Sequence, residues 1–286
     1  MLAQPSIQPF PRTRFAPQNV QRVAPVPHTP RQNRLLAALP PHEYARLLPS
    51  LEFVRLAVGQ TLHRAGESEK HVYFLAAGIV SRAYVMANGD TAEFAITGNE
   101  GAIGIAAILG DDSMPSQAVV LSAGHAYRLR SEVLKSELAH GGALLALLLR
   151  YTHALIAQIG QVAGCNRHHS IEQRLSRWLL SCVDRAPSND LTLTQDMLAN
   201  ILGVRRESIT EAAKNLQKAG AIHYHRGHIT VIERAGLEAR ACECYAAIKR
   251  EYDRLFPHVG TGAPPPRERQ FQREDRLCSS RYGLNG

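Results

Sequence analysis

The 286-residue sequence lacks the features that mark several large classes of protein. Its five cysteines are an odd number without a CxxC pair, which argues against a disulfide framework and against a structural zinc site. Its longest apolar run, residues 143–149, is far shorter than the ~20 residues of a membrane span, so we predict no transmembrane segment. We find no secretory signal pattern near the start and therefore expect a cytoplasmic protein with reduced thiols.

Enzyme motifs are missing as well. The patterns GxSxG, GxxxxGKS/T and HExxH do not occur and the thirteen histidines are scattered, so we predict no catalytic residues, no cofactor and no metal. Cys165 and His169 lie one helical turn apart, but Ser170 predicts the start of a new helix and argues against a shared ion. Cys242 and Cys244 are one residue too close for a CxxC pair, and on a helix such thiols point in different directions.

What the sequence does have is an excess of basic residues, with a net charge of +8. Such a charge suits a polyanionic partner. The excess is uneven, because residues 31–140 carry ten basic and eleven acidic side chains. We therefore expect any nucleic-acid function in the later half of the chain. The tails at residues 1–32 and 257–286 are rich in proline and arginine and are expected to be disordered.

The remaining chain changes its period near residue 140. Short apolar runs separated by Gly59, Gly66, Gly78, Gly89 and Gly98 predict an antiparallel β-roll in residues 33–140, after two short helices. A helical pattern follows, so the fold class is α+β. We expect a long helix over residues 141–168 and a second domain over residues 169–256. The predicted strands cover residues 51–58, 61–63, 72–75, 79–85, 91–96 and 118–129.

The long helix carries a one-sided apolar stripe with steps of three and four residues. Such a stripe predicts packing on the roll and on the same helix of a second subunit, although a buried core helix in a monomer is the alternative. The residues expected to dimerise are Leu144, Leu148, Tyr151, Leu155, Ile159 and Val162.

Residues 191–232 carry the functional signal. Thr194 can cap a helix over residues 195–202, and Gly203 then suits a tight turn into a second helix over residues 206–219. Two apolar runs flanking Arg226-Gly227 predict a hairpin, which completes a winged helix-turn-helix.

The second helix of such a unit enters the major groove of DNA with its first turn foremost. Arg206 can bind guanine and Glu207 can accept from cytosine, so this pair is expected to read a G·C pair. Phosphates are expected to be bound by hydroxyl and wing groups such as Thr194, Ser208 and His225. The full expected DNA-binding set is Thr194, Arg205, Arg206, Glu207, Ser208, Thr210, Glu211, Lys214 and His225.

These patterns together resemble the Crp/Fnr family of bacterial transcription regulators over roughly residues 33–256. The resemblance rests on VGQTL (58–62), Gly66-Glu67, VYFLAAGIV (72–80), the long helix and LANILGVRRESIT (198–210). It implies a cyclic-nucleotide-binding-type roll, a dimerising helix and a DNA-binding winged helix. It also implies that Arg206 and Glu207 read bases, while Glu211 replaces a second base-contacting arginine.

The predicted effector pocket departs from cyclic-nucleotide binders of that family. They use a Gly-Glu turn and an Arg-Ser or Arg-Thr pair, whereas this chain has GAIG (101–104) and MPSQ (114–117). No arginine lies between Arg82 and Arg128, and an unpaired phosphate in an apolar roll is costly, so we predict that cyclic nucleotides do not bind. Six apolar side chains either surround a hydrophobic or gaseous effector or simply belong to the core: Ile103, Ile105, Ile108, Leu109, Val119 and Val120. The pocket residues are predicted to be Gly101, Ala102, Ile103, Ser116 and Gln117.

The sequence therefore predicts a homodimeric, sequence-specific DNA-binding transcriptional regulator. Its expected partners are an operator in double-stranded DNA, a second copy of the chain and RNA polymerase, with an unassigned small-molecule effector and no membrane. The alternative is a ligand-binding regulatory module whose winged helix contacts protein, and operator binding distinguishes the two.

Overall fold

The computed structural model describes residues 28–256, and most of the two predicted tails lies outside the described residues. The described chain begins a few residues earlier than expected. Thr29 caps a short 3-10 helix, and the side-chain amide of the next buried residue, Asn33, donates to the carbonyls of Leu75 and Gly101. These bonds attach the start of the ordered chain to the roll.

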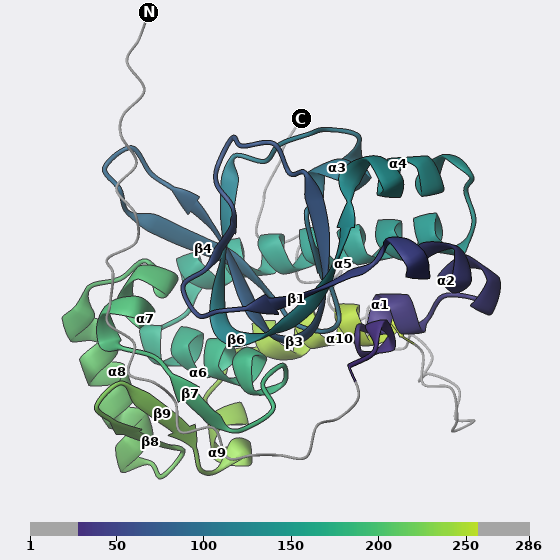
Figure 1. Ribbon diagram of the computed structural model, residues 1–286. Helices are drawn as coiled ribbons and strands as arrows, with labels where there is room; N and C mark the ends of the chain where they lie inside the picture. Colours follow the sequence, from purple (N-terminus) through teal and green to yellow (C-terminus); the bar gives the residue numbers. More distant parts are fainter. Residues whose placement is uncertain (1–27, 257–286) are drawn as a thin grey trace, which may run out of the picture. The chain divides into compact units, whose positions relative to one another are not determined.

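The N-terminal part is the predicted antiparallel roll (Figure 1). Its sheet has the order β1-β6-β3-β4, with β2 paired to β6 and β5 paired to β3. The strands are β1 (Glu52–Leu56), β2 (Thr61–His63), β3 (His71–Val85), β4 (Thr91–Thr97), β5 (Ala102–Ile103) and β6 (Ser116–Arg130).

Strand β3 is one element where the sequence predicted two. Gly78 has a φ of +92°, and the register between β3 and β6 shifts around it. On the facing strand, a Cβ added to Gly124 would lie 2.1 Å from the carbonyl oxygen of Ala77. The two glycines therefore let the strands pass closely through a bulge instead of ending there.

Helices α1 to α4 lie on one side of the roll, and α5 runs behind its sheet (Figure 1). The two predicted N-terminal helices are present, whereas α3 and α4 were not predicted. Both of these are short and lie beside the sheet (Figure 1). The helices of this part are η1 (Pro30–Gln32), α1 (Arg34–Ala37), α2 (Pro41–Leu47), η2 (Leu48–Ser50), α3 (Ala106–Leu109), α4 (Ser131–Ala139) and α5 (Ala143–His168).

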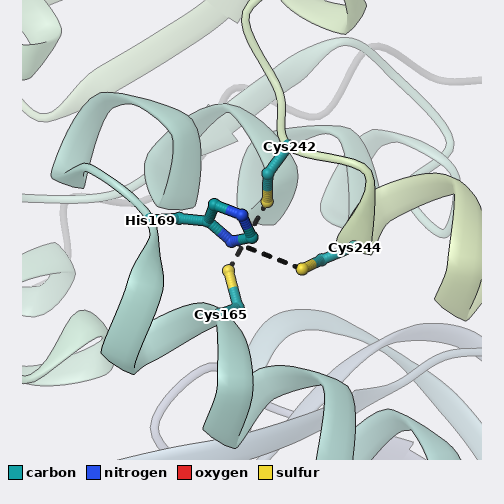
Figure 2. Close-up of side chains that lie close together, drawn as sticks. All are labelled: Cys165, His169, Cys242 and Cys244. Atoms are coloured by element: carbon teal, nitrogen blue, oxygen red, sulfur yellow. Dashed lines mark hydrogen bonds between the residues drawn. The ribbon is translucent and has the colours of Figure 1, made fainter. Parts of the chain in front are cut away.

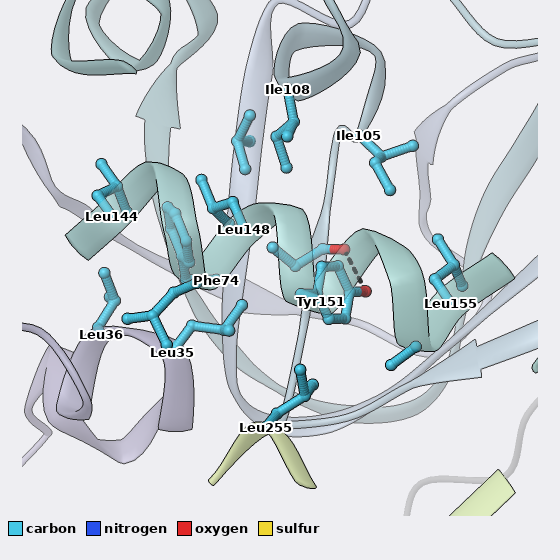
Figure 3. Close-up of a cluster of buried hydrophobic side chains, with 14 of the residues drawn as sticks. Leu35, Leu36, Phe74, Ile105, Ile108, Leu144, Leu148, Tyr151, Leu155 and Leu255 are labelled. Atoms are coloured by element: carbon cyan, nitrogen blue, oxygen red, sulfur yellow. Dashed lines mark hydrogen bonds between the residues drawn. The ribbon is translucent and has the colours of Figure 1, made fainter. Parts of the chain in front are cut away.

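Helix α5 is the predicted long helix, and its apolar stripe faces the chain's own roll. Leu144, Leu148, Tyr151 and Leu155 are at most 3% exposed and pack toward Phe74 and the helix α1 leucines (Figure 3). By length and composition α5 could also cross a membrane. One such helix is weak evidence for a membrane span, because the core helices of soluble proteins pass the same test. Its extensive packing on the roll identifies α5 as a core helix.

The start of α5 is capped from far away in the sequence. Gly142 precedes the helix and offers no side chain, so the first helical N–H groups need another acceptor. Both carboxylate oxygens of Glu43 supply it, at 2.8 Å from the nitrogens of Ala143 and Leu144. These hydrogen bonds lower the pKa of Glu43 and fix α2 against α5.

The C-terminal part is the predicted winged helix-turn-helix, with a third strand, β7, that was not predicted. Strand β9 lies in the middle of the order β7-β9-β8. Helix α10 packs along α5. The elements are α6 (Ile171–Val183), β7 (Asp190–Thr192), α7 (Gln195–Leu202), α8 (Arg206–Lys218), β8 (Ile222–His225), β9 (His228–Val231), α9 (Arg234–Glu238) and α10 (Cys244–Leu255).

The core of the C-terminal part continues into the roll. Ile79 of β3 and Ile96 of β4 belong to the same buried cluster as Trp178 of α6. Residues 28–256 fall within one compact unit. The division at residues 140 and 168 therefore remains a prediction from the sequence.

Candidate nucleic-acid interface and sensor region

The helix-turn-helix forms as its local signals predicted. The Thr194 hydroxyl accepts from the Met197 N–H and caps α7, and Gly203 ends that helix with a φ of +61°. Helix α8 buries the apolar side of its amphipathic pattern, including Ile209 and Leu216, both 0% exposed. Because the buried side of α8 is fixed against α6 and α7, its opposite side points outward.

The outward side of α8 carries most of the residues predicted to contact DNA. Arg205, Arg206, Glu207, Glu211 and Lys214 are exposed, while Ser208 and Thr210 are partly buried. The first turn of α8 therefore presents two guanidinium groups and a carboxylate to solvent.

Arg206 forms an ion pair within the helix-turn-helix that the sequence analysis missed. Its Nε lies 3.5 Å from Oδ1 of Asp196 on α7, and both side chains are more than 60% exposed. An exposed pair of this kind contributes at most ~1 kcal/mol, so it orients Arg206 without holding it firmly.

Thr210 was predicted to contact DNA, but its hydroxyl forms two hydrogen bonds within the helix-turn-helix. Its hydroxyl lies 2.9 Å from Oε1 of Gln195 and 3.1 Å from the carbonyl oxygen of Arg206. These bonds join the first turn of α7 to the first turn of α8. Thr210 is therefore placed to fix the angle between the two helices.

The wing contains a basic residue that the predicted set omitted. Arg226 and Gly227 form the two-residue loop between β8 and β9, with φ values of +47° and +82°. Positive φ at both positions matches the turn that joins twisted strands, and it leaves the exposed Arg226 at the wing tip beside the exposed His225. The sequence signal that could have added Arg226 to the predicted set is an arginine in the turn of a predicted hairpin.

The predicted effector-pocket residues are packed rather than open. Gly101, Ala102, Ile103 and Ser116 are buried, and Gln117 is partly buried. A Cβ on Gly101 would lie 2.6 Å from the ring of Tyr151. Of the six apolar residues predicted for this region, five are at most 9% exposed and only Leu109 is exposed. The five buried residues therefore belong to the core.

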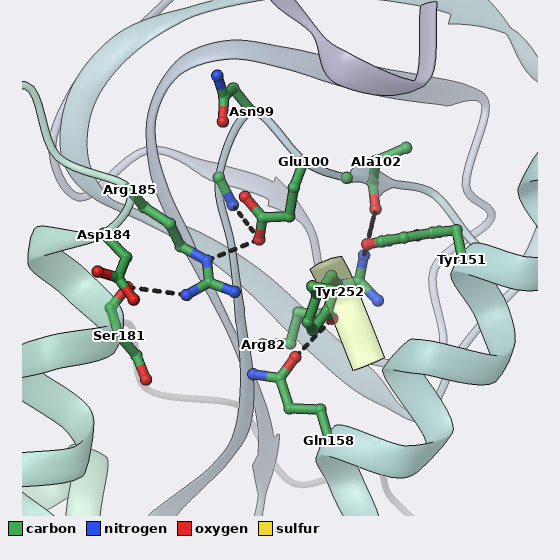
Figure 4. A network of polar contacts seen from close by, with 12 residues as sticks. Arg82, Asn99, Glu100, Ala102, Tyr151, Gln158, Ser181, Asp184, Arg185 and Tyr252 are labelled. Carbon is green, nitrogen blue, oxygen red and sulfur yellow. Dashed lines mark hydrogen bonds and ion pairs between the residues drawn. The ribbon is translucent and has the colours of Figure 1, made fainter. Parts of the chain in front are cut away.

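Polar groups of the chain itself fill the space beside Ala102 (Figure 4). The hydroxyl of Tyr151 donates to the Ala102 carbonyl at 2.9 Å, and the Arg82 guanidinium donates to the same carbonyl and to the Tyr151 hydroxyl. Arg82 is only 3% exposed. One terminal nitrogen of this buried arginine is therefore engaged by α5 and β5, while its Nε has no hydrogen-bond partner among the described residues.

A small hollow lies elsewhere, between the roll and α7. It offers about 20 Å³, close to the room that one water molecule needs. Gln117 is the one residue of the predicted pocket that lines it, together with Glu93 and Met197. Its size is far below the ~300 Å³ of ordinary ligand pockets.

Polar contacts join the roll to α6. Glu93 on β4 accepts from the Trp178 indole at 2.6 Å and from the Ser81 hydroxyl at 2.5 Å. Desolvation raises the pKa of Glu93 to about 7. Nearby, Arg185 lies 2.6 Å from Oε1 of Glu100, and both side chains are at least 90% buried (Figure 4).

The sulfur-containing residues depart most from expectation. The structure brings Cys165, His169, Cys242 and Cys244 together, with their potential ligand atoms all within 4.8 Å of one another. Ser170 caps a new helix as predicted, and α5 ends at His168. His169 nevertheless lies in the C-cap of α5 close to Cys165, so the break between the helices does not separate the two residues. Cys242 precedes α10 rather than lying on it, so the argument from helix geometry does not apply to Cys242 and Cys244.

Comparisons with known proteins agree with this architecture. Residues 53–140 match the model of the cyclic nucleotide-binding domain, and residues 173–240 match the model of the Crp-like helix-turn-helix domain. The two models together cover more than half of the chain. A comparison with curated protein sequences gives no match.

Solved structures show the same fold. A transcriptional regulator of the Crp/Fnr family from Eubacterium rectale has a TM-score of 0.60 and 16% identity, over 73% of this chain and 98% of that one. FixK2 from Bradyrhizobium japonicum has a TM-score of 0.59 and 14% identity, over 67% and 98%. The c-di-GMP-responsive regulator CLP from Xanthomonas campestris has a TM-score of 0.52 and 15% identity, over 66% and 98%.

The sensor-type roll and the winged helix-turn-helix thus occur together, in the order that defines one group of regulators, and both match its domain models. The chain belongs to the Crp/Fnr family of DNA-binding transcriptional regulators.

Proposed function

We propose that this protein is a homodimeric, sequence-specific transcriptional regulator that reads DNA with the first turn of α8. The observation that carries the proposal is the exposed Arg205-Arg206-Glu207 run at the start of a helix whose other side is fully packed. Two arginines oppose the dipole at a helix N-terminus, so their placement there favours an anionic partner outside the chain.

The exposed side chains divide into two functional classes. Arg206 and Glu207 reach base edges in the major groove, since the first turn lies deepest. Arg205, Lys214, His225 and Arg226 are placed for phosphates, joined by the hydroxyls of Thr194 and Ser208. Glu211 discourages phosphate contact one turn along. Thr210 acts within the unit, through its bonds to Gln195 and Arg206.

Dimerisation is assigned to the face of α5 that the roll leaves uncovered. Leu149 and Ile156 are 51% and 63% exposed, although both are large apolar side chains. They lie on one face with Gly160 and Gly164, where an added Cβ would meet nothing within 4 Å. Small residues beside exposed apolar ones favour close packing of a second helix, and a symmetric dimer presents α8 to two half-sites.

The sensor function differs from that of a cyclic-nucleotide binder. Tyr151 and Arg82 occupy the space beside Ala102, and the roll offers no arginine between positions 82 and 128 for a phosphate. We therefore assign no effector to this roll. We place the protein in the cytoplasm, together with the DNA. RNA polymerase is a further expected partner, and we assign no residue to that contact.

Enrichment of genomic fragments on the full-length protein tests the proposal. The expected result is a small set of fragments that share a two-fold symmetric motif. The Lys214→Ala variant is the matched control, because it removes an exposed charge from the same helix without touching the first turn. Enrichment without a shared motif, or capture of proteins but no DNA, would contradict the proposal.

A further inference from the structure

Four potential metal ligands converge where α5 meets α10 (Figure 2). Cys165 lies in the last turn of α5, and His169 is the residue that ends that helix. Cys242 precedes α10, and Cys244 is its first residue. The ligands thus come from two segments more than 70 residues apart in sequence.

The spacing of the ligand atoms fits a single tetrahedral ion. Sγ of Cys165 lies 3.5 Å from Sγ of Cys242, and Sγ of Cys244 lies 3.5 Å from Nδ1 of His169. With Zn–S of ~2.3 Å and Zn–N of ~2.1 Å, a tetrahedral zinc ion separates two thiolates by ~3.8 Å and a thiolate from an imidazole nitrogen by ~3.6 Å. Small movements would bring all four ligands to these distances.

The imidazole is oriented as a ligand requires. Nδ1 of His169 faces Cys244, while Nε2 lies 3.2 Å from Oε1 of Glu243. Metal-binding histidines usually donate their second ring N–H to a carboxylate or carbonyl, which fixes the ring and leaves the other nitrogen for the ion. Glu243 stands between the two cysteine ligands in sequence and supplies this carboxylate.

The charge and burial of the cluster also fit. All three thiols are at most 5% exposed. One Zn²⁺ with three thiolates and a neutral imidazole carries a net charge of −1, and the buried guanidinium of Arg177 lies close enough to act on Cys165.

The cysteine cluster lies outside the larger hydrophobic cores. The three cysteines form a buried cluster of their own, separate from the larger hydrophobic cores. Helix α10 packs on α5 mainly through Ile248 and Tyr252, so the cysteines themselves add little apolar area to the junction. Weak contacts of the thiols with one another, with Gln161 and with His169 contribute little compared with a closed metal site.

We propose that Cys165, His169, Cys242 and Cys244 bind one zinc ion in a closed structural site. All four positions are filled by protein ligands, so the ion holds no water for catalysis. An iron–sulfur cluster does not fit, because its ligands are spread over two or more irons, whereas the four ligand atoms here all lie within 4.8 Å of one another. Binding releases the thiol protons to solvent, so the affinity rises with pH until the thiols are ionised.

The position of the site gives it a consequence for DNA binding, which rests on the proposed function. The ion would clamp the start of α10 to the end of α5, directly before the first helix of the DNA-binding part. Loss of zinc would loosen the junction through which a dimer sets the spacing of its two α8 helices. Zinc availability would then control operator affinity.

Metal titration of the full-length reduced protein tests the site without DNA. Competition with a chromophoric zinc chelator should give one ion per chain, and Co²⁺ should give visible bands of a tetrahedral ion with a thiolate-to-metal charge-transfer band. Cys165→Ser and Cys244→Ser should weaken binding by more than the ~10 to 100-fold expected for Glu243→Gln, which changes only the partner of His169.

Cys182→Ser is the matched control, because Cys182 is equally buried in α6 but lies outside the cluster. It should retain one ion with unchanged affinity, as should Cys278→Ser. Since wild-type binding and its cobalt spectrum need no variant, a variant that misfolds does not remove the test.

Three results would overturn the proposal. The first is reduced wild-type protein that binds no zinc at micromolar concentration, and the second is equal binding by Cys165→Ser and wild type. The third is a Cys165–Cys242 disulfide in protein purified under reductant, seen as a loss of two mass units in the linked peptides. Zinc binding with no DNA binding would leave the site standing and contradict the proposed function alone.

Discussion

Two arginines of this protein have opposite environments. Arg206 at the start of α8 is 61% exposed and meets Asp196 at 3.5 Å, whereas Arg82 inside the roll is 3% exposed and donates to Ala102 and Tyr151. An exposed ion pair contributes at most ~1 kcal/mol and can be exchanged for a new partner. A buried guanidinium that loses its partners costs several kcal/mol.

The difference separates a surface that awaits a ligand from an interior that has already filled its space. Arg206 can leave Asp196 for a base edge at little cost. Arg82 cannot leave Ala102 and Tyr151 for a phosphate without unsatisfying groups that are buried with it. The same residue type is therefore available for recognition on α8 and structural in the roll.

Removing Tyr151 should give the largest effect, because Tyr151 is a buried partner of Arg82 in the roll. Tyr151→Ala deletes a fully buried ring and should lower the free energy of unfolding by ~3 to 5 kcal/mol. Tyr151→Phe keeps the ring and should cost only ~1 to 3 kcal/mol, for the lost hydroxyl. Urea unfolding measures both, and a Tyr151→Ala protein as stable as wild type would show that the interior is not packed as described.

The exposed side of the comparison predicts a change in DNA binding without a change in stability. Arg206→Ala should cost ~1 to 3 kcal/mol of affinity for the preferred site. Lys214→Ala should instead weaken binding to all sequences equally and reduce the salt slope by ~1. Fluorescence anisotropy at several salt concentrations measures both variants. Equal behaviour of the two would remove the distinction between base-reading and phosphate-binding residues.

Dimer formation should depend on the uncovered face of α5. The double variant Leu149→Glu, Ile156→Glu places two charges where a second helix would pack, and should sediment as a monomer with lost operator affinity. Leu109→Glu is the control, since Leu109 is 55% exposed on α3, away from that face. A wild-type monomer that binds its operator would contradict the assignment.

Glu93 should link stability to pH at the contact between the roll and α6. Its pKa of about 7 in the folded chain lies above the ordinary value of 4.5, so the folded state holds an extra proton between these pH values. Its contribution to stability is present below pH 4.5 and is lost as the pH rises through 7.

Glu93→Gln keeps an acceptor for Trp178 but cannot ionise, and its amide N–H can donate to the Ser81 hydroxyl in place of accepting from it. We expect the stability difference between wild type and Glu93→Gln to change by about 2 to 3 kcal/mol between pH 5 and pH 8, with the variant gaining at pH 8. Urea midpoints at both pH values measure it. A difference that does not vary with pH would show that Glu93 ionises normally.

Calorimetry with cyclic AMP and cyclic GMP at millimolar concentration carries the smallest expected effect. The packed space beside Ala102 predicts no saturable heat for either nucleotide. Heat that saturates with a micromolar constant would show that Tyr151 and Arg82 yield their space to a ligand.

Local signals of the sequence predicted the winged helix well. Thr194 and Gly203 set the ends of α7, and Ser170 with Gln173 forms the expected capping box of α6. Each of these features depends on residues within four positions of one another. Such signals survive folding because the backbone groups that they satisfy are also local.

Features that depend on distant residues were less accessible. The stripe on α5 correctly predicted a buried face, but periodicity alone does not say whether the roll or a second subunit covers it. The Cys165 cluster joins residues 77 positions apart, and spacing rules for metal sites consider neighbours in sequence. The bulge that carries β3 through Gly78 needs the facing Gly124, which only the register of the strands brings into contact.

Selection of binding sites from random DNA by wild-type and Arg206→Ala protein tests the central claim most directly. The account predicts that wild type selects a two-fold symmetric motif with a G·C pair at one position in each half-site, and that Arg206→Ala loses the preference at that position in both. Selection of the same motif by Arg206→Ala, at unchanged information content, would contradict the assignment of α8 as the base-reading helix.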